Sequence, residues 1–210
     1  MTTGAEAAHR GRERGNRSRR LITRHAVDIA SLDGLGGLSF GRLAEDLELS
    51  KAGIQTLFRT KERLQLATID TAGELFADAV IAPSREASEG APRLHALVEH
   101  WIDYAARPLF AGGCFWGANL PDFDSHPGPV RDALVLGHRA WLGALTRQLE
   151  LAAAQNACSA TDIESATFQI DAVLMAANTA LRLGDTSGIA KVRRIVGTLV
   201  PPPVAESPSE

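Results

Sequence analysis

The sequence predicts an all-α protein, and three observations support that fold class. Apolar residues recur three or four positions apart along most of the 210-residue chain, as on the buried face of a helix. We find no clear alternation of apolar and polar residues, which is the pattern of a half-buried strand. Aromatic residues make up only 5% of the chain and alanine is abundant, which favours closely packed helices over a β-sandwich.

The first part of the chain predicts four helices after an N-terminal arm. Residues 1–16 are rich in Gly, Ala, Arg and Glu without an apolar period, so we expect a flexible arm. The predicted helices span residues 17–32, 40–47, 51–58 and 61–82. Hydroxyl residues that can cap a helix precede the last three, namely Ser39, Ser50 and Thr60. We expect Pro83 to end the fourth helix, because proline has no N–H for the helical ladder.

Five more helices follow, which brings the expected total to about nine. They span residues 93–106, 115–120, about 129–156, 162–183 and 187–199. Thr161 is the expected N-cap of the fourth of these helices, and Gly184 its end. The polar, proline-rich residues 201–210 predict a disordered tail.

Composition excludes several classes of protein. The two cysteines, Cys114 and Cys158, cannot form a disulfide framework and lack metal-ligand spacing, so we expect a reducing cytoplasm. No apolar run is long enough for a membrane span, and the N-terminus lacks the pattern of a secretory signal. Without a catalytic triad order, a phosphate loop or a metal motif, we expect no enzyme, no cofactor and no metal site. Cys114 is expected to be a buried, unreactive thiol.

Charge is distributed unevenly along the chain. Residues 1–63 carry 12 Lys and Arg against 8 Asp and Glu, whereas residues 64–210 carry 10 against 17. The basic first part, which we call the head, is predicted to bind a polyanion. The acidic second part, the body, is predicted to avoid it. Most of the basic residues are arginines, which can bind a phosphate or a guanine edge through two parallel hydrogen bonds.

Residues 39–58 have the dimensions of a helix-turn-helix. The predicted helix 51–58 is the second helix of this motif. It offers small and polar side chains near its N-terminus, as a helix that enters the major groove must. Gln55 can pair with an adenine edge, and Thr56 can meet a thymine methyl or a phosphate. Lys61 can bind a phosphate, and so can the start of the helix 40–47, where Ser39 and Arg42 lie. The residues that we expect to contact DNA are Arg17, Arg19, Arg20, Ser39, Arg42, Ser50, Lys51, Ala52, Gly53, Gln55, Thr56 and Lys61.

Residues 17–66 resemble the DNA-binding domain of the TetR family of bacterial transcriptional regulators. The resemblance is carried by the run from Leu49 to Leu64, with its Phe-x-x-Lys-Glu-x-Leu ending, and by upstream residues at the family's positions. Those upstream residues are Ile22, Ala26, Gly34, Ser39, Leu43 and Ala44. The chain departs from the family at Glu48, where a glycine is usual in the turn. It departs also at Gln55 and Leu57, which replace a frequent aromatic and a frequent histidine.

The resemblance implies a DNA-binding domain over 17–63 and an effector-binding and dimerisation domain over 64–200. Aromatic residues gather in the second domain beside a glycine-rich stretch, where they can line an apolar pocket or simply fill the core. The expected pocket residues are Trp101, Tyr104, Phe110, Cys114, Phe115, Trp116, Asn119, Phe123 and Trp141.

The last two predicted helices suit a dimer interface. Their apolar stripes, with many alanines that permit close approach, can form a four-helix bundle about a two-fold axis. The expected interface residues are Ala166, Ile170, Val173, Leu174, Ala177, Leu181, Val192, Ile195, Val196 and Leu199.

The sequence thus predicts a ligand-responsive regulator, with three kinds of partner. As a homodimer it would bind palindromic double-stranded DNA, with its two heads about one helical turn, roughly 34–36 Å, apart. An unidentified small apolar or aromatic effector would release it, which describes a repressor. The alternative is an architectural DNA-binding protein without an effector, in which the aromatic residues form a packed core.

Overall fold

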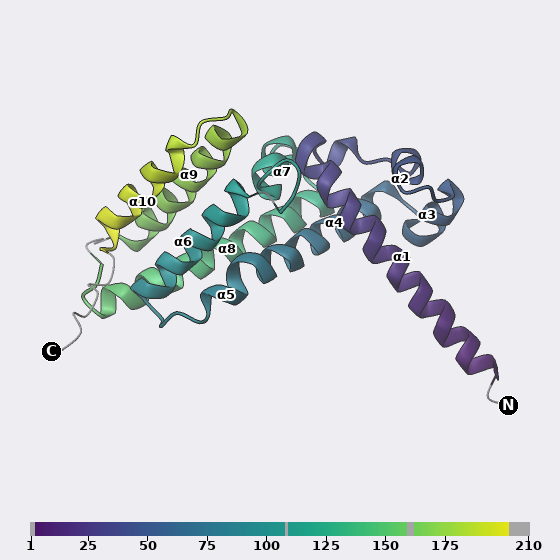
Figure 1. The fold of residues 1–210 in the computed structure, drawn as a ribbon, viewed down its shortest axis with the longest axis horizontal. Helices are drawn as coiled ribbons and strands as arrows, with labels where there is room; N and C mark the ends of the chain where they lie inside the picture. The colour runs from purple at the N-terminus through teal and green to yellow at the C-terminus, as the bar shows by residue number, and fades with distance from the viewer. Residues whose placement is uncertain (1–2, 108, 159–161, 202–210) are drawn as a thin grey trace. The chain divides into compact units, whose positions relative to one another are not determined.

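The computed structural model describes residues 3–107, 109–158 and 162–201, and this part of the chain is helical without strands. The predicted all-α class is therefore confirmed. The chain folds into two compact units, which Figure 1 shows in sequence colours. The first unit comprises Met1–Glu74 and Phe110–Leu134, and the second comprises Leu75–Leu109 and Val135–Glu210. None of the described helices combines the length and apolar character needed to cross a membrane.

The helices run in the order that the sequence predicts. The first unit holds α1 (Thr3–Asp33), the 3₁₀ turn η1 (Leu35–Gly37), α2 (Phe40–Asp46), α3 (Lys51–Phe58), most of α4 (Lys61–Phe76) and α7 (Phe115–Phe123). The second holds the π-helical segment η2 (Ala77–Ile81), α5 (Ala82–Ser84), α6 (Ala91–Ala106), most of α8 (Pro129–Ala154), α9 (Ile163–Arg182) and α10 (Ser187–Leu199). With α4, η2 and α5 counted as one continuous run, the described residues form nine helices besides η1.

The unit boundaries differ from the predicted boundary after residue 63. Residues 110–134 lie far along the chain but pack with α1 in the first unit. A close approach requires Gly112 there, because a Cβ on this residue would collide with the carbonyl oxygen of Ser31. The amide of Gly112 donates to the Ser31 hydroxyl at 2.8 Å. Such a tertiary contact leaves no periodic signal in the sequence.

Three helices form the core of the first unit, as predicted. Ile22 and Ala26 of α1, Leu43 of α2 and Ile54 of α3 have at most 1% of their surface exposed. The predicted caps are confirmed: Ser39 accepts from the amide of Arg42, and Ser50 from that of Gly53, both at 3.1 Å. These caps satisfy N–H groups that would otherwise have no partner in the helix.

The turn between α2 and α3 is left-handed at Glu48, with φ of 53°. A non-glycine residue there costs on the order of 1 kcal/mol, as expected from the departure at this position. The amide of Leu49, the next residue, donates to the carbonyl of Ala44 at 2.9 Å, which closes the end of α2.

The first helix begins at Thr3, although residues 1–16 were expected to be a flexible arm and the helix to start at residue 17. Apolar periodicity detects helices that are buried on one face, and this segment has no such face. Its alanines, glutamates and arginines are nevertheless among the best helix formers. The prediction was wrong because a segment without a buried face can still be helical.

The long helix from Lys61 changes type near Pro83 instead of ending at residue 82. Thr60 caps it as expected, since its hydroxyl accepts from the amide of Arg63 at 3.1 Å. The π-helical turns of η2 follow Phe76, and α5 then carries the helix through Pro83 to Ser84. Proline cannot donate in the ladder, and such irregular turns commonly accommodate the loss. The Ser84 hydroxyl donates to the carbonyl of Val80 at 2.6 Å.

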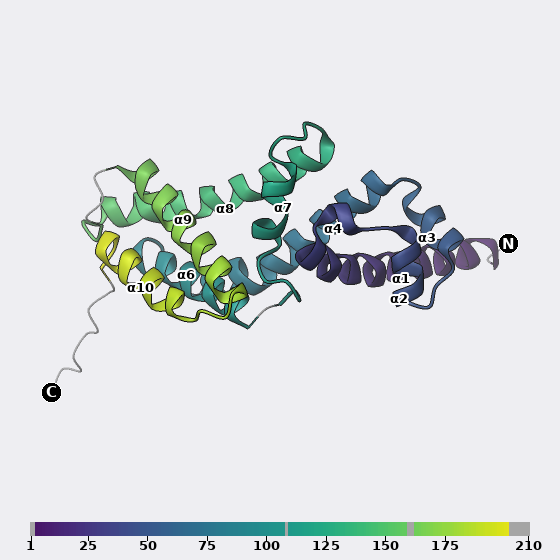
Figure 2. The same ribbon diagram turned by 90° about the horizontal axis from the view of Figure 1, so that it is seen from above.

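In the second unit, α9 and α10 lie side by side and antiparallel, as Figures 1 and 2 both show. Gly188 lets them approach closely, since a Cβ there would lie 3.3 Å from the Cα of Ala177. The N-cap of α9 is Asp162, which accepts from the amide of Ser165 at 3.1 Å; the predicted cap, Thr161, lies outside the described residues. The hydroxyl and amide hydrogen bonds from Ser165 lower the pKa of Asp162.

Candidate nucleic-acid interface and effector site

The outward face of α3 carries the small and polar side chains that the sequence predicts to contact DNA. Ile54 and Phe58, each 1% exposed, anchor the helix from behind. The exposed residues of the predicted set are Ser50, Lys51, Ala52, Gly53, Gln55 and Thr56. No bulky apolar side chain stands on this face, so a groove wall can approach the helix closely.

Local hydrogen bonds fix two of these residues. A Cβ on Gly53 would lie 2.8 Å from the capping hydroxyl of Ser50, so a side chain there would disturb the cap. Thr56 donates its hydroxyl to the carbonyl of Ala52 at 2.8 Å. Because this bond uses the hydroxyl proton, contact with a thymine methyl suits Thr56 better than donation to a phosphate.

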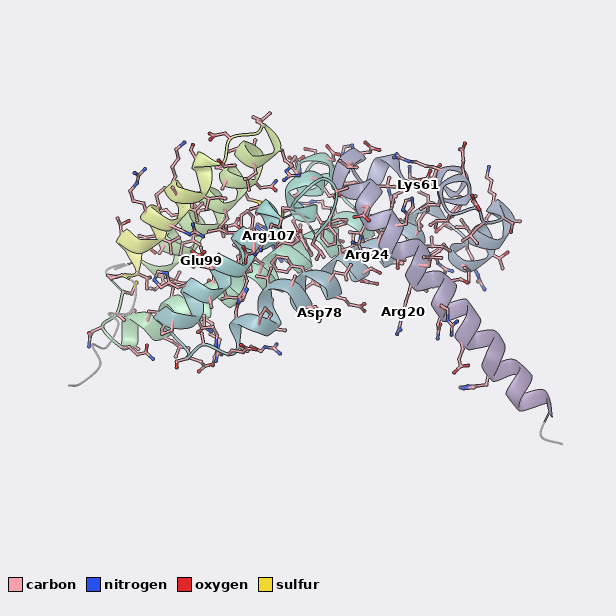
Figure 3. The ribbon with its side chains drawn as sticks, viewed as in Figure 1. Arg20, Arg24, Lys61, Asp78, Glu99 and Arg107 are labelled. Atoms are coloured by element: carbon pink, nitrogen blue, oxygen red, sulfur yellow. The ribbon has the colours of Figure 1, made fainter. Side chains whose placement is uncertain are left out.

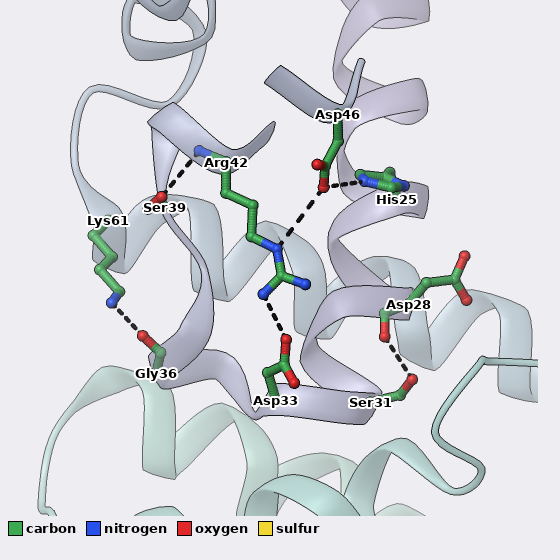
Figure 4. Close-up of polar contacts among 9 residues, drawn as sticks. All are labelled: His25, Asp28, Ser31, Asp33, Gly36, Ser39, Arg42, Asp46 and Lys61. Carbon is green, nitrogen blue, oxygen red and sulfur yellow. Dashed lines mark hydrogen bonds and ion pairs between the residues drawn. The ribbon is translucent and has the colours of Figure 1, made fainter. Parts of the chain in front are cut away.

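A small hollow of about 290 Å³ lies where the starts of α2, α3 and α4 meet. Its lining residues are Ser39, Phe40, Gly41, Lys51, Lys61 and Leu64. Lys61 donates from Nζ to the carbonyl of Gly36 at 2.6 Å, which positions its ammonium group beside η1 (Figures 3 and 4). Two lysines beside a hydroxyl-capped helix start form a surface that an anionic oxygen can approach.

Arg42, for which the sequence predicts a phosphate contact, also makes structural contacts. Its guanidinium donates to Asp33 at 2.5 Å and lies 3.8 Å from a carboxylate oxygen of Asp46 (Figure 4). Asp46 also forms a hydrogen bond with Nε2 of His25 at 2.9 Å. The network ties α2 to α1 and compensates the charge of Arg42. Sequence spacing gives no sign of the His25 and Asp33 partners, since both lie on another helix.

The three predicted arginines of α1 differ in their surroundings. The guanidinium of Arg19 lies 4.8 Å from the ring centre of Phe58, so it stacks on the end of α3. Arg17 and Arg20 are exposed, and Arg20 points away from α1 into solvent (Figure 3). Arg59 and Arg63, which are not among the predicted residues, are also exposed, at the end of α3 and in α4. Their place directly after the predicted recognition helix is the signal that could have identified them.

The predicted effector residues fall into two clusters, one in each unit. The first contains Phe110, Phe115 and Trp116, all buried, with Phe115 5.5 Å from Trp116 and 6.4 Å from Phe110 between ring centres. Cys114 is buried beside them, and its thiol forms no disulfide. Phe123 is half-buried and lies edge-on to His126.

Asn119 has a structural position, although the sequence predicts it as a polar group of the pocket. It is fully buried; its side-chain oxygen accepts from the amide of Leu35 at 2.7 Å. Its nitrogen donates to the carbonyls of Ala30 and Phe115. Both amide protons are therefore already used in holding α7 to the end of α1.

The second cluster joins Trp101, Tyr104 and Trp141 around Phe76, which the sequence analysis did not single out. The ring of Phe76 packs edge-on against Tyr104 at 5.3 Å and Trp141 at 5.5 Å. The indole N–H of Trp141 donates to Asp171 at 3.2 Å. Whether either cluster opens to hold an effector stays a prediction.

Six of the ten predicted interface residues belong to the core of the second unit. Each has at most 3% of its surface exposed: Ala166, Ile170, Leu174, Ala177, Val192 and Val196. The other four are half-buried: Val173, Ile195, Leu181 and Leu199. A side chain without exposed surface has none to offer a partner. These six residues therefore belong to the face by which α9 and α10 pack within their own unit, and a role of the other four in a dimer stays a prediction.

Apolar residues also stand on the opposite, solvent-facing side of α9. Phe168 is 73% exposed, and Leu183, just past the helix end, is 82% exposed. Exposed small residues lie between them at helical spacing: Ala172, Ala176 and Thr179.

No candidate metal site is found in the described part of the chain. It contains no group of three or more His, Cys, Asp or Glu side chains placed to hold an ion.

Comparison with known structures supports the fold. A TetR transcriptional regulator from Chloroflexus aurantiacus J-10-FL superposes with a TM-score of 0.80 at 20% identity, covering 89% of this chain and 95% of that one. AibR, in complex with isovaleryl coenzyme A and operator DNA, gives 0.72 at 20% identity, with 88% and 98% covered. A putative transcriptional regulator from Saccharomonospora viridis, in complex with choline, gives 0.73 at 17% identity, with 87% and 94% covered.

Sequence comparison gives the family directly. No curated protein matches the chain. Residues 90–196, just over half of the chain, match the family model described as the tetracyclin repressor-like, C-terminal domain. This match lies outside the helix-turn-helix segment that carries the resemblance noted from the sequence, so the two are independent. The chain belongs to the TetR family of transcriptional regulators.

Proposed function

We propose that this chain is a DNA-binding regulator that reads a palindromic operator with α3 in the major groove. The observation that carries the proposal is the outward face of α3, which is small and polar around Gln55 while Ile54 and Phe58 hold the helix from behind. Gln55 makes bidentate contact with an adenine edge, and the methyl of Thr56 packs on a thymine methyl.

Phosphate contacts position the helix in the groove. Lys51 and Lys61 bind backbone phosphates from the hollow beside α2, where Ser39 caps the helix. Arg17, Arg20, Arg59 and Arg63 add positive charge around it. These contacts supply affinity for any duplex, whereas those from α3 supply the preference for one sequence.

The regulator acts as a homodimer through the exposed stripe of α9, formed by Phe168, Ala172, Ala176, Thr179 and Leu183. An apolar face of this kind is stabilised when a second copy covers it about a two-fold axis. The small residues let the two copies of α9 approach closely, and Phe168 and Leu183 supply the large apolar side chains. Two heads then read half-sites about one DNA turn, roughly 34–36 Å, apart.

A small apolar or aromatic effector releases the dimer from DNA, which makes the regulator a repressor. The aromatic clusters around Phe76 and Phe115 supply the apolar surface that such a ligand needs. Two neighbours of this fold are complexes with isovaleryl coenzyme A and with choline, which supports a ligand-binding role for this chain. Binding changes the tilt of α4, which runs from the head into the second unit, and hence the spacing of the heads.

The free-energy requirement on the effector is modest. A ligand shifts the dimer only by its difference in affinity between the DNA-fitting and the released arrangement. A coupling of about 1–3 kcal/mol changes operator affinity roughly 5–150-fold.

Selection of binding sites from random duplex DNA tests the proposal. We expect a palindromic motif whose two halves are centred about 10 bp apart, and we expect some small apolar compound to weaken binding to it. Binding without sequence preference would remove the operator-reading role. A palindromic motif with affinity that no compound alters would favour an architectural protein instead.

A further inference from the structure

The helix α1 is much longer than the head requires. Its first fully buried side chain is Ile22, yet the helix begins at Thr3. At 1.5 Å per residue, the segment before Ile22 adds about 28 Å of helix. The described side chains before Gly15, His9 and Glu13, are both exposed. Figure 1 shows this end of α1 projecting away from α2 and α3 of its own unit.

The projecting segment is strongly basic. Residues 3–20 contain six arginines and only two acidic residues, and one of these, Glu13, is paired with His9 at 3.1 Å. Arg10, Arg14 and Arg17 lie four and three positions apart, so they share one face of the helix. Arg12 and Arg19 lie seven apart on another.

Such a helix is poorly stabilised by itself. It has no apolar face to bury, and most helical stability in proteins comes from that burial. Like charges at i and i+4, as at Arg10 and Arg14, destabilise a helix further. A polyanion that neutralises this face removes the repulsion, so the segment and an anionic partner stabilise each other.

The position of the segment selects the partner. Arg19 stacks on Phe58, the last residue of α3, so the projecting helix leaves the head beside the recognition helix. Whatever duplex α3 contacts is therefore the polyanion nearest to this segment of α1. Arginine also binds phosphate oxygens through two parallel hydrogen bonds.

We propose that residues 3–20 of α1 are a second DNA-contact element, which lies along the phosphates flanking each operator half-site. The inference rests on the proposed function and adds a surface outside the helix-turn-helix. Its contacts go to the backbone, so they raise affinity and salt dependence for any flanking sequence without changing base preference. The part of the segment before Arg19 is about 24 Å long, which corresponds to roughly seven base pairs beyond the half-site.

The test compares two triple variants on two duplexes. The arm variant replaces Arg10, Arg12 and Arg14 with Gln. The control replaces Arg85, Arg107 and Arg194, exposed arginines of the second unit, also with Gln, so the two variants have the same net charge. One duplex is trimmed to the selected motif, and the other carries about one further helical turn of arbitrary sequence at each end. Affinity is measured as a function of salt concentration, and thermal unfolding confirms that both variants fold.

We expect the wild-type chain and the control to bind the flanked duplex about ten-fold or more tightly than the trimmed one at low salt. The arm variant should lose that gain, and its salt slope on the flanked duplex should fall by about 0.9 for each phosphate contact removed, up to roughly 5 for a dimer. Its ratio of operator to random-sequence affinity should stay unchanged.

Three results would overturn the inference. The arm variant could keep the wild-type slope, the control could weaken as much as the arm variant, or the arm variant could lose base preference. A wild-type chain that binds no duplex ends the proposed function itself. Wild-type binding with an unaffected arm variant ends only the present inference.

Discussion

The solvent-facing sides of α3 and α9 differ in the partner that each can accept. Both helices bury one apolar stripe in their own unit, Ile54 and Phe58 on α3 and Ile170 and Leu174 on α9. The outward side of α3 is small and polar, beside a lysine-lined hollow. That of α9 is small and apolar, with Phe168 73% exposed. The outward face of α3 suits a hydrated, charged DNA groove, whereas that of α9 suits another apolar helix.

The two faces of a helix therefore carry different information and must be examined separately. The stripe with the strongest apolar period tells which side packs within the unit, and it says little about partners. The residues left on the opposite side carry that information, and they are recognised only once the inward side is known. The following predictions test this division of roles.

The largest effect is expected from Phe168→Glu. A carboxylate within the proposed interface would have to lose its hydration against an apolar partner, so the dimer should dissociate. Operator affinity should fall by at least about 100-fold, because one head retains only half of the contacts. Analytical ultracentrifugation and operator titration measure the two quantities.

The matched control is Gln169→Glu, which places the same charge on the neighbouring exposed position of α9. It should stay dimeric with nearly unchanged affinity. If Phe168→Glu is also dimeric, the interface lies elsewhere and the comparison with α3 fails.

A smaller effect is expected from Gln55→Ala. Loss of a bidentate contact to adenine should cost about 1–3 kcal/mol at one base pair of each half-site and leave random-sequence affinity nearly intact. Repeating the site selection with the variant measures this directly, since the motif should lose its preference at that position alone. An unchanged motif would mean that Gln55 faces solvent in the complex.

Lys61→Ala should act on every duplex alike. Removing one phosphate contact should lower the salt slope by about 0.9 per head, with operator and random DNA weakened by similar factors. Lys191→Ala, an exposed lysine of α10, is the control and should have no effect. Equal behaviour of the Gln55 and Lys61 variants would contradict the docking of α3.

The smallest effect is expected from Asp162→Ala at the start of α9. The pKa of Asp162 is lowered in the folded protein by its bonds from Ser165. A lowered folded pKa means that the cap stabilises the fold above the carboxyl's unfolded pKa, and that this is lost as pH falls through the folded pKa. The variant should therefore melt slightly below the wild-type chain at neutral pH, with the gap closing in acid. A gap that persists in acid would assign the effect to something other than the carboxylate.

Local features of the fold could be predicted from the sequence because they depend on neighbouring residues. The caps at Ser39, Ser50 and Thr60 follow from hydroxyl groups placed just before apolar helices. The bounds of α3 and α10 follow from the same short-range patterns. The positive φ at Glu48 follows from its place in the turn.

What could not be predicted depends on contacts between distant segments. Gly112 and Asn119 bring residues 110–134 into the first unit through bonds to Ser31 and Leu35, more than 80 positions away. Arg42 pairs with Asp33, a partner on another helix that sequence spacing does not reveal. The extension of α1 to Thr3 could not be predicted because a helix without a buried face has no apolar period.

Photo-crosslinking from residues 55 and 168 tests the central claim most directly. A photoreactive amino acid replaces one residue at a time, and each protein is irradiated with the selected duplex. The account predicts crosslinks from position 55 to bases at two symmetric sites about 10 bp apart. From position 168 it predicts crosslinks to a second copy of the chain. Crosslinks from position 168 to DNA, or from position 55 to protein alone, would contradict it.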